Sequence, residues 1–112
     1  MKISKEDKYW SQAVKILANN KCEYCNHPAE NSHHFYSRKY KGIRYDVNNG
    51  FSLCVKHHFF AHHRPADFVA WAIAKRGELW HKMLRDKSNR VKIDVTPDQL
   101  YCRQVCENAK NV

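Results

Sequence analysis

Two pairs of metal-ligand residues constrain this chain more than any other feature. They are Cys22-x-x-Cys25 and, far downstream, Cys54-x-x-His57. Zinc prefers four sulfur or nitrogen ligands in a tetrahedron, and two intervening residues let both members of a pair reach one ion without strain. A chain of 112 residues builds only a small core, so an ion held here would contribute much of the folding free energy. We therefore expect both segments to meet at a structural Zn²⁺ site.

Spacing excludes one competing arrangement of ligands and leaves another open. A sequential C2H2 finger needs about twelve residues between its cysteine pair and its first histidine, whereas seven separate Cys25 from His33. Cys102 and Cys106 are four positions apart near the C-terminus and are an alternative to His57 as the fourth ligand. Local spacing favours His57, and the two late cysteines are otherwise expected to be partly buried free thiols. The odd total of five cysteines argues against a disulfide framework.

Hydrophobic periodicity and capping residues predict an α+β domain that is mostly helical, with one β-hairpin in its middle. Ser4 and Asp7 form a capping pair for the first helix, and Thr96 is expected to be the N-cap of the last. Pro65 is expected to end a helix, and Gly77 to separate the two helices that follow. The predicted helices cover residues 5–19, 55–63, two segments after 65, and 97–109, and the predicted strands cover 33–38 and 50–54.

The core is expected from apolar residues that recur at helical spacing. In the first helix they are Trp10, Ala13, Val14 and Leu17. Such a stripe most simply packs against the rest of the domain.

The chain is strongly basic, with 20 Lys and Arg residues against 11 Asp and Glu, a net charge of +9 and a pI of about 9.5. This balance favours a polyanionic partner, DNA above all, although a basic surface can also be only a solvated face. The N-terminal MKISKEDKYW lacks the apolar segment of a signal peptide, and no segment approaches the ~20 apolar residues of a bilayer span. We therefore expect a soluble, cytoplasmic protein with no membrane partner.

Six of the eight histidines lie between residues 33 and 63. Beyond the zinc pairs, His58 and His62 form an i, i+4 pair on one face of a predicted helix, where two imidazoles can hold one ion. His63 points about 140° away from His58 on an ideal helix and is the spare. His33 and His34 are adjacent on a predicted strand and therefore point to opposite sides. One of them can bind metal while the other faces a substrate.

These residues resemble the HNH motif of ββα-metal (His-Me finger) endonucleases. The family pattern Asn-x-x-x-Leu-Cys-x-x-Cys-His is matched by Asn49-Gly50-Phe51-Ser52-Leu53-Cys54-Val55-Lys56-His57-His58, with His57 in place of the second cysteine. The resemblance covers about residues 22–63, and the segments HHFYSR and LCVKHHFFAHH are similar to those of small phage or prophage HNH proteins. It implies one HNH domain over residues 1–112, in which N- and C-terminal helices flank a ββα-metal core with a structural zinc site. Residues 66–112 form a helical extension to which the resemblance assigns no function.

The resemblance also implies roles for individual residues. His34 would be the general base, and Asn49 would steady the hairpin loop. His33, His58 and His62 would hold a catalytic divalent ion, Mg²⁺, Mn²⁺, Ni²⁺ or Zn²⁺, as in the nuclease-colicin branch. The implied reaction is hydrolysis of DNA phosphodiester bonds by nicking or double-strand cleavage, with a 5′ phosphate on the product. The form of the substrate, its sequence and the oligomeric state, monomer or homodimer, stay open.

The loop between the predicted strands is the expected DNA contact. Residues 36–45 contain four basic residues and three tyrosines but no acid. Such a loop can hold phosphates and rest aromatic faces on sugars or bases. The four basic residues are Arg38, Lys39, Lys41 and Arg44. Two alternatives stand beside these expectations: a solvated loop whose tyrosines pack on the core, and a zinc-stabilised nucleic-acid-binding module without catalytic activity.

Overall fold

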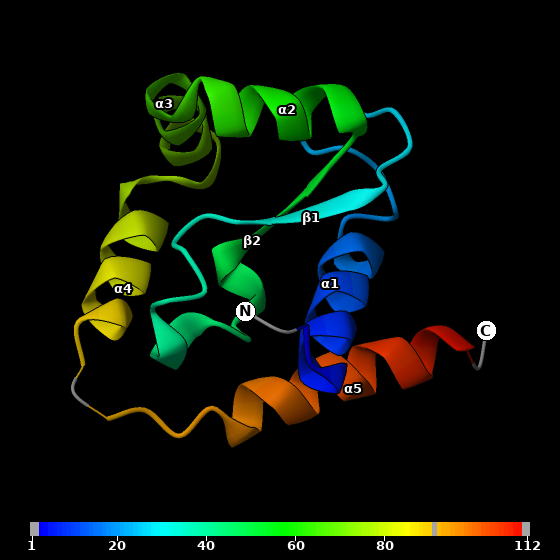
Figure 1. Ribbon diagram of the computed structural model, residues 1–112, viewed down its shortest axis with the longest axis vertical. Helices are drawn as coiled ribbons and strands as arrows, with labels where there is room; N and C mark the ends of the chain where they lie inside the picture. Colours follow the sequence, from blue (N-terminus) through cyan, green and yellow to red (C-terminus); the bar gives the residue numbers. More distant parts are fainter. Residues whose placement is uncertain (1–2, 91, 111–112) are drawn as a thin grey trace.

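The computed structural model describes residues 3–90 and 92–110, which form five α-helices and a two-stranded antiparallel sheet (Figure 1). The elements are α1 (Lys5–Leu17), β1 (Asn31–His34), β2 (Gly50–Leu53), α2 (Val55–His63), α3 (Pro65–Arg76), α4 (Glu78–Ser88) and α5 (Thr96–Lys110). This confirms the predicted α+β class. Among the described residues, no helix combines the length and the apolar composition that crossing a bilayer requires.

The hairpin is shorter than predicted, because β1 ends at His34 and not at residue 38. Its register pairs Asn31 with Leu53 and His34 with Gly50. Beyond this last pair, residues 47–49 form a 3-10 turn, so they offer no extended partner. The Phe35 N–H still donates to the Asn49 carbonyl at 2.9 Å, and at Tyr36 the side chain of Asn49 takes the place of a strand partner.

The helix boundaries follow local signals with one correction, at the start of α5. The capping box of Ser4 and Asp7 is confirmed, and Gly77, with φ of 97°, separates α3 from α4 as predicted. α2 ends at His63, before Pro65, as predicted, and Pro65 is the first residue of α3. A proline fits that position because its missing N–H would have no partner inside the helix. Thr96 is the first residue of α5 and not its N-cap, because the first intrahelical bond runs from the Gln99 N–H to the carbonyl of Val95 at 3.0 Å.

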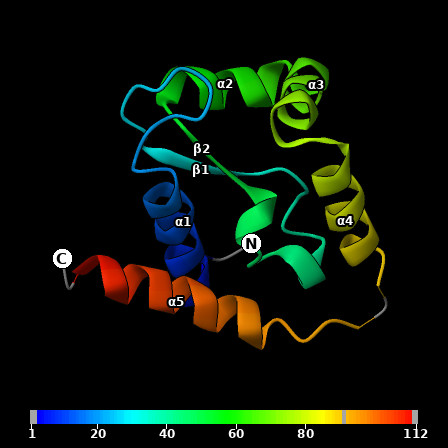
Figure 2. The ribbon, with the colours of Figure 1, turned by 180° about the vertical axis from the view of Figure 1, so that it is seen from behind.

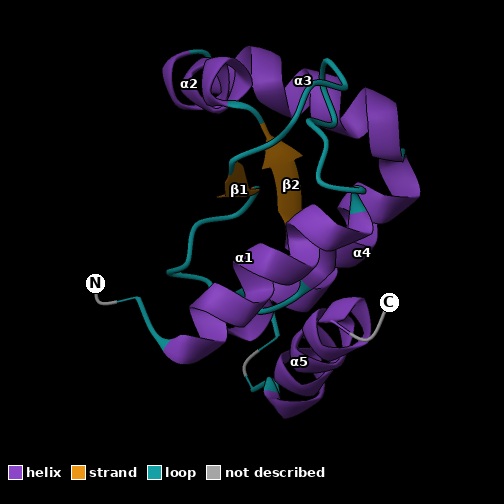
Figure 3. Ribbon diagram, turned by 90° about the vertical axis from the view of Figure 1, so that its right-hand side faces the viewer, coloured by secondary structure: helices purple, strands orange, loops and turns teal. Residues whose placement is uncertain are grey.

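Two groups of buried side chains lie on opposite sides of the hairpin. The first packs the hairpin against α2 and α3 and contains Cys22, Phe51, Leu53, Ala61, Phe68 and Ala72. The second joins α1 to α5, which lie side by side in Figure 3, and contains Trp10, Ala13, Val14, Cys102 and Cys106. Leu17 was expected in this core, but half of it is exposed because it lies in the last turn of α1.

α2 crosses one end of the hairpin, and α1 lies beside the sheet (Figures 1 and 2). This arrangement places the first strand between two helices. Residues that alternate along β1 can therefore face α2 on one side and α1 on the other. His33 of β1 points toward α2, and His34 points toward α1.

Candidate functional site

Three cysteines and one histidine come together at the N-terminal end of α2. Cys54 is the N-cap residue of that helix, His57 lies in its first turn, and Cys22 and Cys25 approach from the loop after α1. The ligand atoms of all four lie within 4.8 Å of one another. This Cys3His cluster could hold a structural metal ion, and the two pairs meet as their spacing predicted.

The distances within the cluster match those of a tetrahedral zinc site. Two sulfurs on one Zn²⁺ lie about 3.8 Å apart, and a sulfur and a nitrogen about 3.5 Å apart, when the bonds have their usual lengths. Cys25 Sγ and Cys54 Sγ are separated by 3.7 Å. His57 Nδ1 lies 3.3 Å from Cys54 Sγ and 3.7 Å from Cys22 Sγ. The donor set and its spacing both fit zinc.

The loop around Cys22 prepares that side chain for metal binding. Burial raises the pKa of the Cys22 thiol, but backbone N–H groups of Cys54, Cys25 and Tyr24 outweigh burial and lower it overall. A lowered pKa favours the thiolate, which is the form that binds metal. Tyr24 also stacks on the His57 ring with centroids 4.2 Å apart, which fixes the imidazole orientation.

Cys102 and Cys106 lie in the other buried group, on α5. Their thiols donate to the backbone carbonyls of Tyr45 and Tyr9. Burial raises the pKa of Cys102 to about 12, so its thiol stays protonated. His57, and neither of these cysteines, therefore completes the Cys3His cluster.

A second cluster contains His33 from β1 and His58 and His62 from α2. Their ligand nitrogens lie within 4.8 Å of one another, and Nε2 of His58 is 3.0 Å from Nε2 of His62. Burial, with the neighbouring imidazoles, lowers the pKa of His33 to about 4, and burial also lowers that of His58. Neutral imidazoles are the form that binds a metal ion. The predicted set of three is therefore brought together between β1 and α2, and burial keeps His33 and His58 in the form that binds metal.

His34 points to the other side of β1, as strand alternation predicts. Its ring stacks on Trp10 of α1 with centroids 3.7 Å apart and planes at 7°. Its Nε2 donates to the backbone carbonyl of Arg44 at 3.1 Å. Burial lowers the pKa of His34 to about 4, against an opposing effect of that hydrogen bond. The ring is therefore neutral at pH 7, with its proton on Nε2 and a lone pair on Nδ1.

Arg44 was expected to contact phosphate, but its guanidinium is bonded within the protein. Nε and Nη2 donate to the two carboxylate oxygens of Asp7 at 2.9 and 2.6 Å. Asp7 in turn accepts from the backbone N–H and hydroxyl of Ser4. The pair ties the hairpin loop to α1 and so helps hold the carbonyl that receives the His34 proton.

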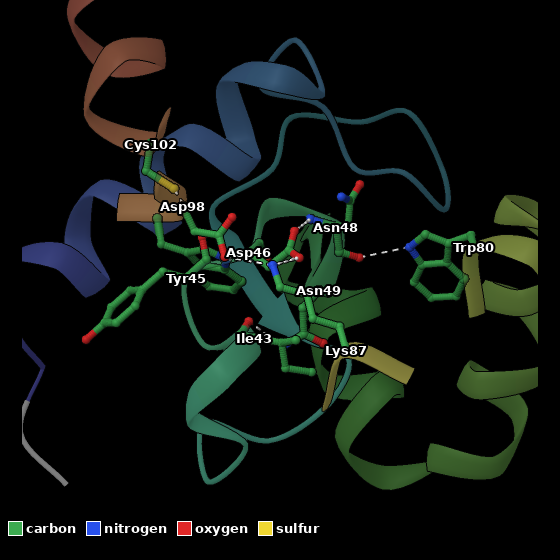
Figure 4. Close-up of polar contacts among 10 residues, drawn as sticks. Ile43, Tyr45, Asp46, Asn48, Asn49, Trp80, Lys87, Asp98 and Cys102 are labelled. Atoms are coloured by element: carbon green, nitrogen blue, oxygen red, sulfur yellow. Dashed lines mark hydrogen bonds and ion pairs between the residues drawn. The ribbon is translucent and has the colours of Figure 1, made fainter. Parts of the chain in front are cut away.

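Asn49 bridges the hairpin loop, as expected from the sequence. It is fully buried, and its side chain accepts from the backbone N–H of Tyr36 at 2.7 Å. The same amide donates to the carbonyls of Tyr36 and Ile43 at 2.9 and 3.4 Å. Figure 4 shows its place beside Ile43 in this loop. Each amide atom therefore holds a segment of the loop that follows His34.

The second cluster opens into a pocket of about 570 Å³. His34 and Arg38 line this pocket together with His33, His58 and His62. Lys39 and Lys41 are exposed further along the loop. His63 lies on the outer side of α2, where it stacks on Phe59 with centroids 3.8 Å apart. Of the four basic residues of the loop, Arg38 is the one at the pocket.

Sequence reasoning did not identify the two α1 residues that contact this site, Asp7 and Trp10. Asp7 had been assigned to the helix cap and Trp10 to the core, and both assignments are correct. Each side chain has a second role through a contact with the hairpin. Because residues 36–45 contain no acid, a carboxylate partner for Arg44 had to come from another segment. The sequence does not indicate that this partner is Asp7.

Compared with protein-family models, with curated proteins and with solved structures, the chain matches none of them. The class of protein therefore follows from the fold and from the metal-ligand residues of the chain itself. It is an α+β protein with a Cys3His cluster that could hold a structural metal ion.

Proposed function

We propose that this protein is a metal-dependent DNA endonuclease of the HNH type, with β1, β2 and α2 as its ββα-metal core. One observation carries the proposal: three imidazoles converge at the pocket that His34 also lines. A general base next to an open metal site is the arrangement that phosphodiester hydrolysis needs. The basic charge of the chain suits a DNA substrate.

His34 would act as the general base through Nδ1. The Nε2–H bond to the Arg44 carbonyl keeps the proton on the far nitrogen, so Nδ1 can accept a proton from the attacking water. The stacked Trp10 ring limits rotation of the imidazole. Asn49 would act indirectly by holding the loop that carries this carbonyl.

His33, His58 and His62 would hold the divalent ion, and their three nitrogens fit an ion that also needs sites open to phosphate and water. When bound, that ion would polarise a phosphate oxygen and stabilise charge on the leaving oxygen. Arg38, at the edge of the same pocket, would bind a phosphate of the substrate.

Cleavage of supercoiled plasmid in Mg²⁺, Mn²⁺, Ni²⁺ or Zn²⁺, compared with chelator, tests the proposal. We expect His34→Ala to reduce the rate at least ~100-fold, which is the usual contribution of a general base. His63→Ala is the matched control, because His63 lies on the same helix region but outside the cluster. It should cleave like the wild type, and circular dichroism should show both variants folded.

Equal activity of His34→Ala and His63→Ala would contradict the assigned base. Absence of cleavage by the wild type on duplex, single-stranded and branched DNA with every ion would contradict the nuclease itself. A zinc-stabilised DNA-binding module would then be the remaining function if the protein still binds DNA.

A further inference from the structure

A second depression lies on the α1 side of His34. It has a volume of about 450 Å³ and shares three residues with the metal pocket, Ser32, His34 and Arg38. The stacked rings of Trp10 and His34 line it, so it adjoins the proposed base directly. The two depressions therefore form one track that passes from the histidine cluster, over His34, to α1.

The α1 wall of this track is basic. Lys8, Gln12 and Lys15 line it at i, i+4 and i+7, which is one face of a helix. Arg38 stands where the two depressions meet. Among the residues that the structure describes, Lys8, Lys15 and Arg38 take part in no ion pair.

Acids do not cancel this charge. Within the described part of the chain, Asp7 is the one acid that lines either depression. Its carboxylate is already bonded to Arg44, and its side chain is 6% exposed. The charge presented to a ligand therefore comes from the two lysines and the arginine.

We infer that the α1 face is the binding site for the DNA backbone on one side of the phosphate to be cleaved. Lys15 lies seven positions after Lys8, which corresponds to about 10.5 Å along the helix. Successive phosphates of one strand advance about 3.4 Å along the duplex axis, so the face matches about three phosphate-to-phosphate steps. The place of this face beside a phosphate to be cleaved rests on the proposed function, whereas the binding of DNA to it does not.

Fluorescence anisotropy with a labelled duplex, without added divalent ion, measures binding separately from cleavage. Lys8→Ala/Lys15→Ala should raise Kd on the order of 10-fold and lower the salt slope by about 2, since each lysine contacts one phosphate. The control Lys56→Ala/Lys110→Ala removes the same charge from exposed positions that line neither depression. It should leave the salt slope near the wild-type value. Lys8→Gln/Lys15→Gln, which keeps longer side chains on α1, should repeat the effect while thermal unfolding stays unchanged.

Equal weakening by the two double variants would overturn the inference, because net charge alone would then explain binding. Failure of the wild type to bind DNA would overturn it as well. If the α1 variants lose binding but the wild type cuts no DNA, the α1 site stands and the nuclease proposal fails. If the wild type cuts DNA and the α1 variants match their control, the nuclease stands and the α1 site fails.

Discussion

His34 is held by groups from three separate segments. β1 supplies its backbone, α1 supplies the stacked Trp10 ring, and the hairpin loop supplies the Arg44 carbonyl. Trp10 is itself fixed, because its Nε1 donates to the carbonyl of Asp46 at 2.9 Å. A histidine held in this way has one tautomer and one orientation, which suits proton transfer.

Asp7 connects this arrangement to the stability of the fold. Burial raises its pKa, but hydrogen bonds from Arg44 and Ser4 outweigh burial and lower the pKa from 3.8 to about 2. Because the folded pKa lies below the unfolded one, Asp7 stabilises the protein at pH values above about 4. That contribution is lost as the pH falls toward about 2.

We therefore expect Asp7→Asn to cost about 2–3 kcal/mol of unfolding free energy at pH 7, because the folded pKa of Asp7 is about 2 against 3.8 and a tenfold change in an equilibrium constant corresponds to about 1.4 kcal/mol. The difference between wild type and variant should shrink as the pH falls from about 4 to 2. Urea denaturation of both proteins across this range measures it. Protonation of the metal-ligand residues changes the unfolding free energy of both proteins equally, so it cancels in the difference between them. A difference that stays constant with pH would contradict the assignment.

At the scale of elements, β2 and α1 are in direct contact through Gly50. A Cβ at Gly50 would lie 2.5 Å from Val14 Cγ2 and 2.8 Å from Trp10 Cζ2. The φ angle of Gly50 is −123°, so the backbone itself would accept a larger residue. The restriction is therefore one of space, and it keeps α1 close enough for Trp10 to stack on His34.

Gly50→Ala should destabilise the protein by about 1–3 kcal/mol, the usual cost of overpacking a core. It should also reduce the proposed DNA cleavage, since α1 and Trp10 must shift. Gly77→Ala is an informative comparison, because a Cβ there meets nothing within 4 Å but the φ of 97° is strained. That variant should lose stability without a change in the geometry around His34. Thermal unfolding and tryptophan fluorescence would separate the two cases, and wild-type fluorescence in Gly50→Ala would contradict the contact.

Across the whole molecule, α2 connects the two clusters of metal-ligand residues. Its N-terminal end carries Cys54 and His57, and His58 and His62 face the pocket beside β1. An ion in the Cys3His cluster would therefore fix the helix that aims the histidines. The hairpin in turn lies between the buried group around α2 and the one that joins α1 to α5.

If the Cys3His cluster holds a structural ion, its removal should unfold most of the molecule. Structural zinc sites contribute on the order of 10 kcal/mol, which is comparable to the whole stability of a small domain.

Three variants test this role. Cys25→Ser should lose the ion and the cooperative thermal transition, whereas Cys102→Ala should keep the ion. His62→Ala should keep the transition and lose only metal bound at the second cluster. Metal analysis with calorimetry checks all three, and an unchanged transition after chelation would contradict a structural role.

Local patterns in the sequence determined the metal-ligand pairs and several helix boundaries. The ligand spacing in Cys22-x-x-Cys25 and Cys54-x-x-His57, the capping box at Ser4 and the break at Gly77 all depend on residues a few positions apart. Their geometry follows from backbone conformation alone, so it can be derived before the fold is known. The opposite directions of His33 and His34 follow from the same kind of rule.

Only the tertiary structure decided which distant groups surround His34. Asp7 and Arg44 are 37 positions apart, and no periodicity relates them. The early end of β1 likewise depends on the side chain of Asn49, which bonds to a backbone 13 positions away. Such contacts follow from the packing of α1 against the hairpin, where burial makes each polar group find a partner. The sequence therefore predicts which residue types form the site. The groups that hold them in place, such as Trp10 and the Arg44 carbonyl, follow only from the tertiary packing.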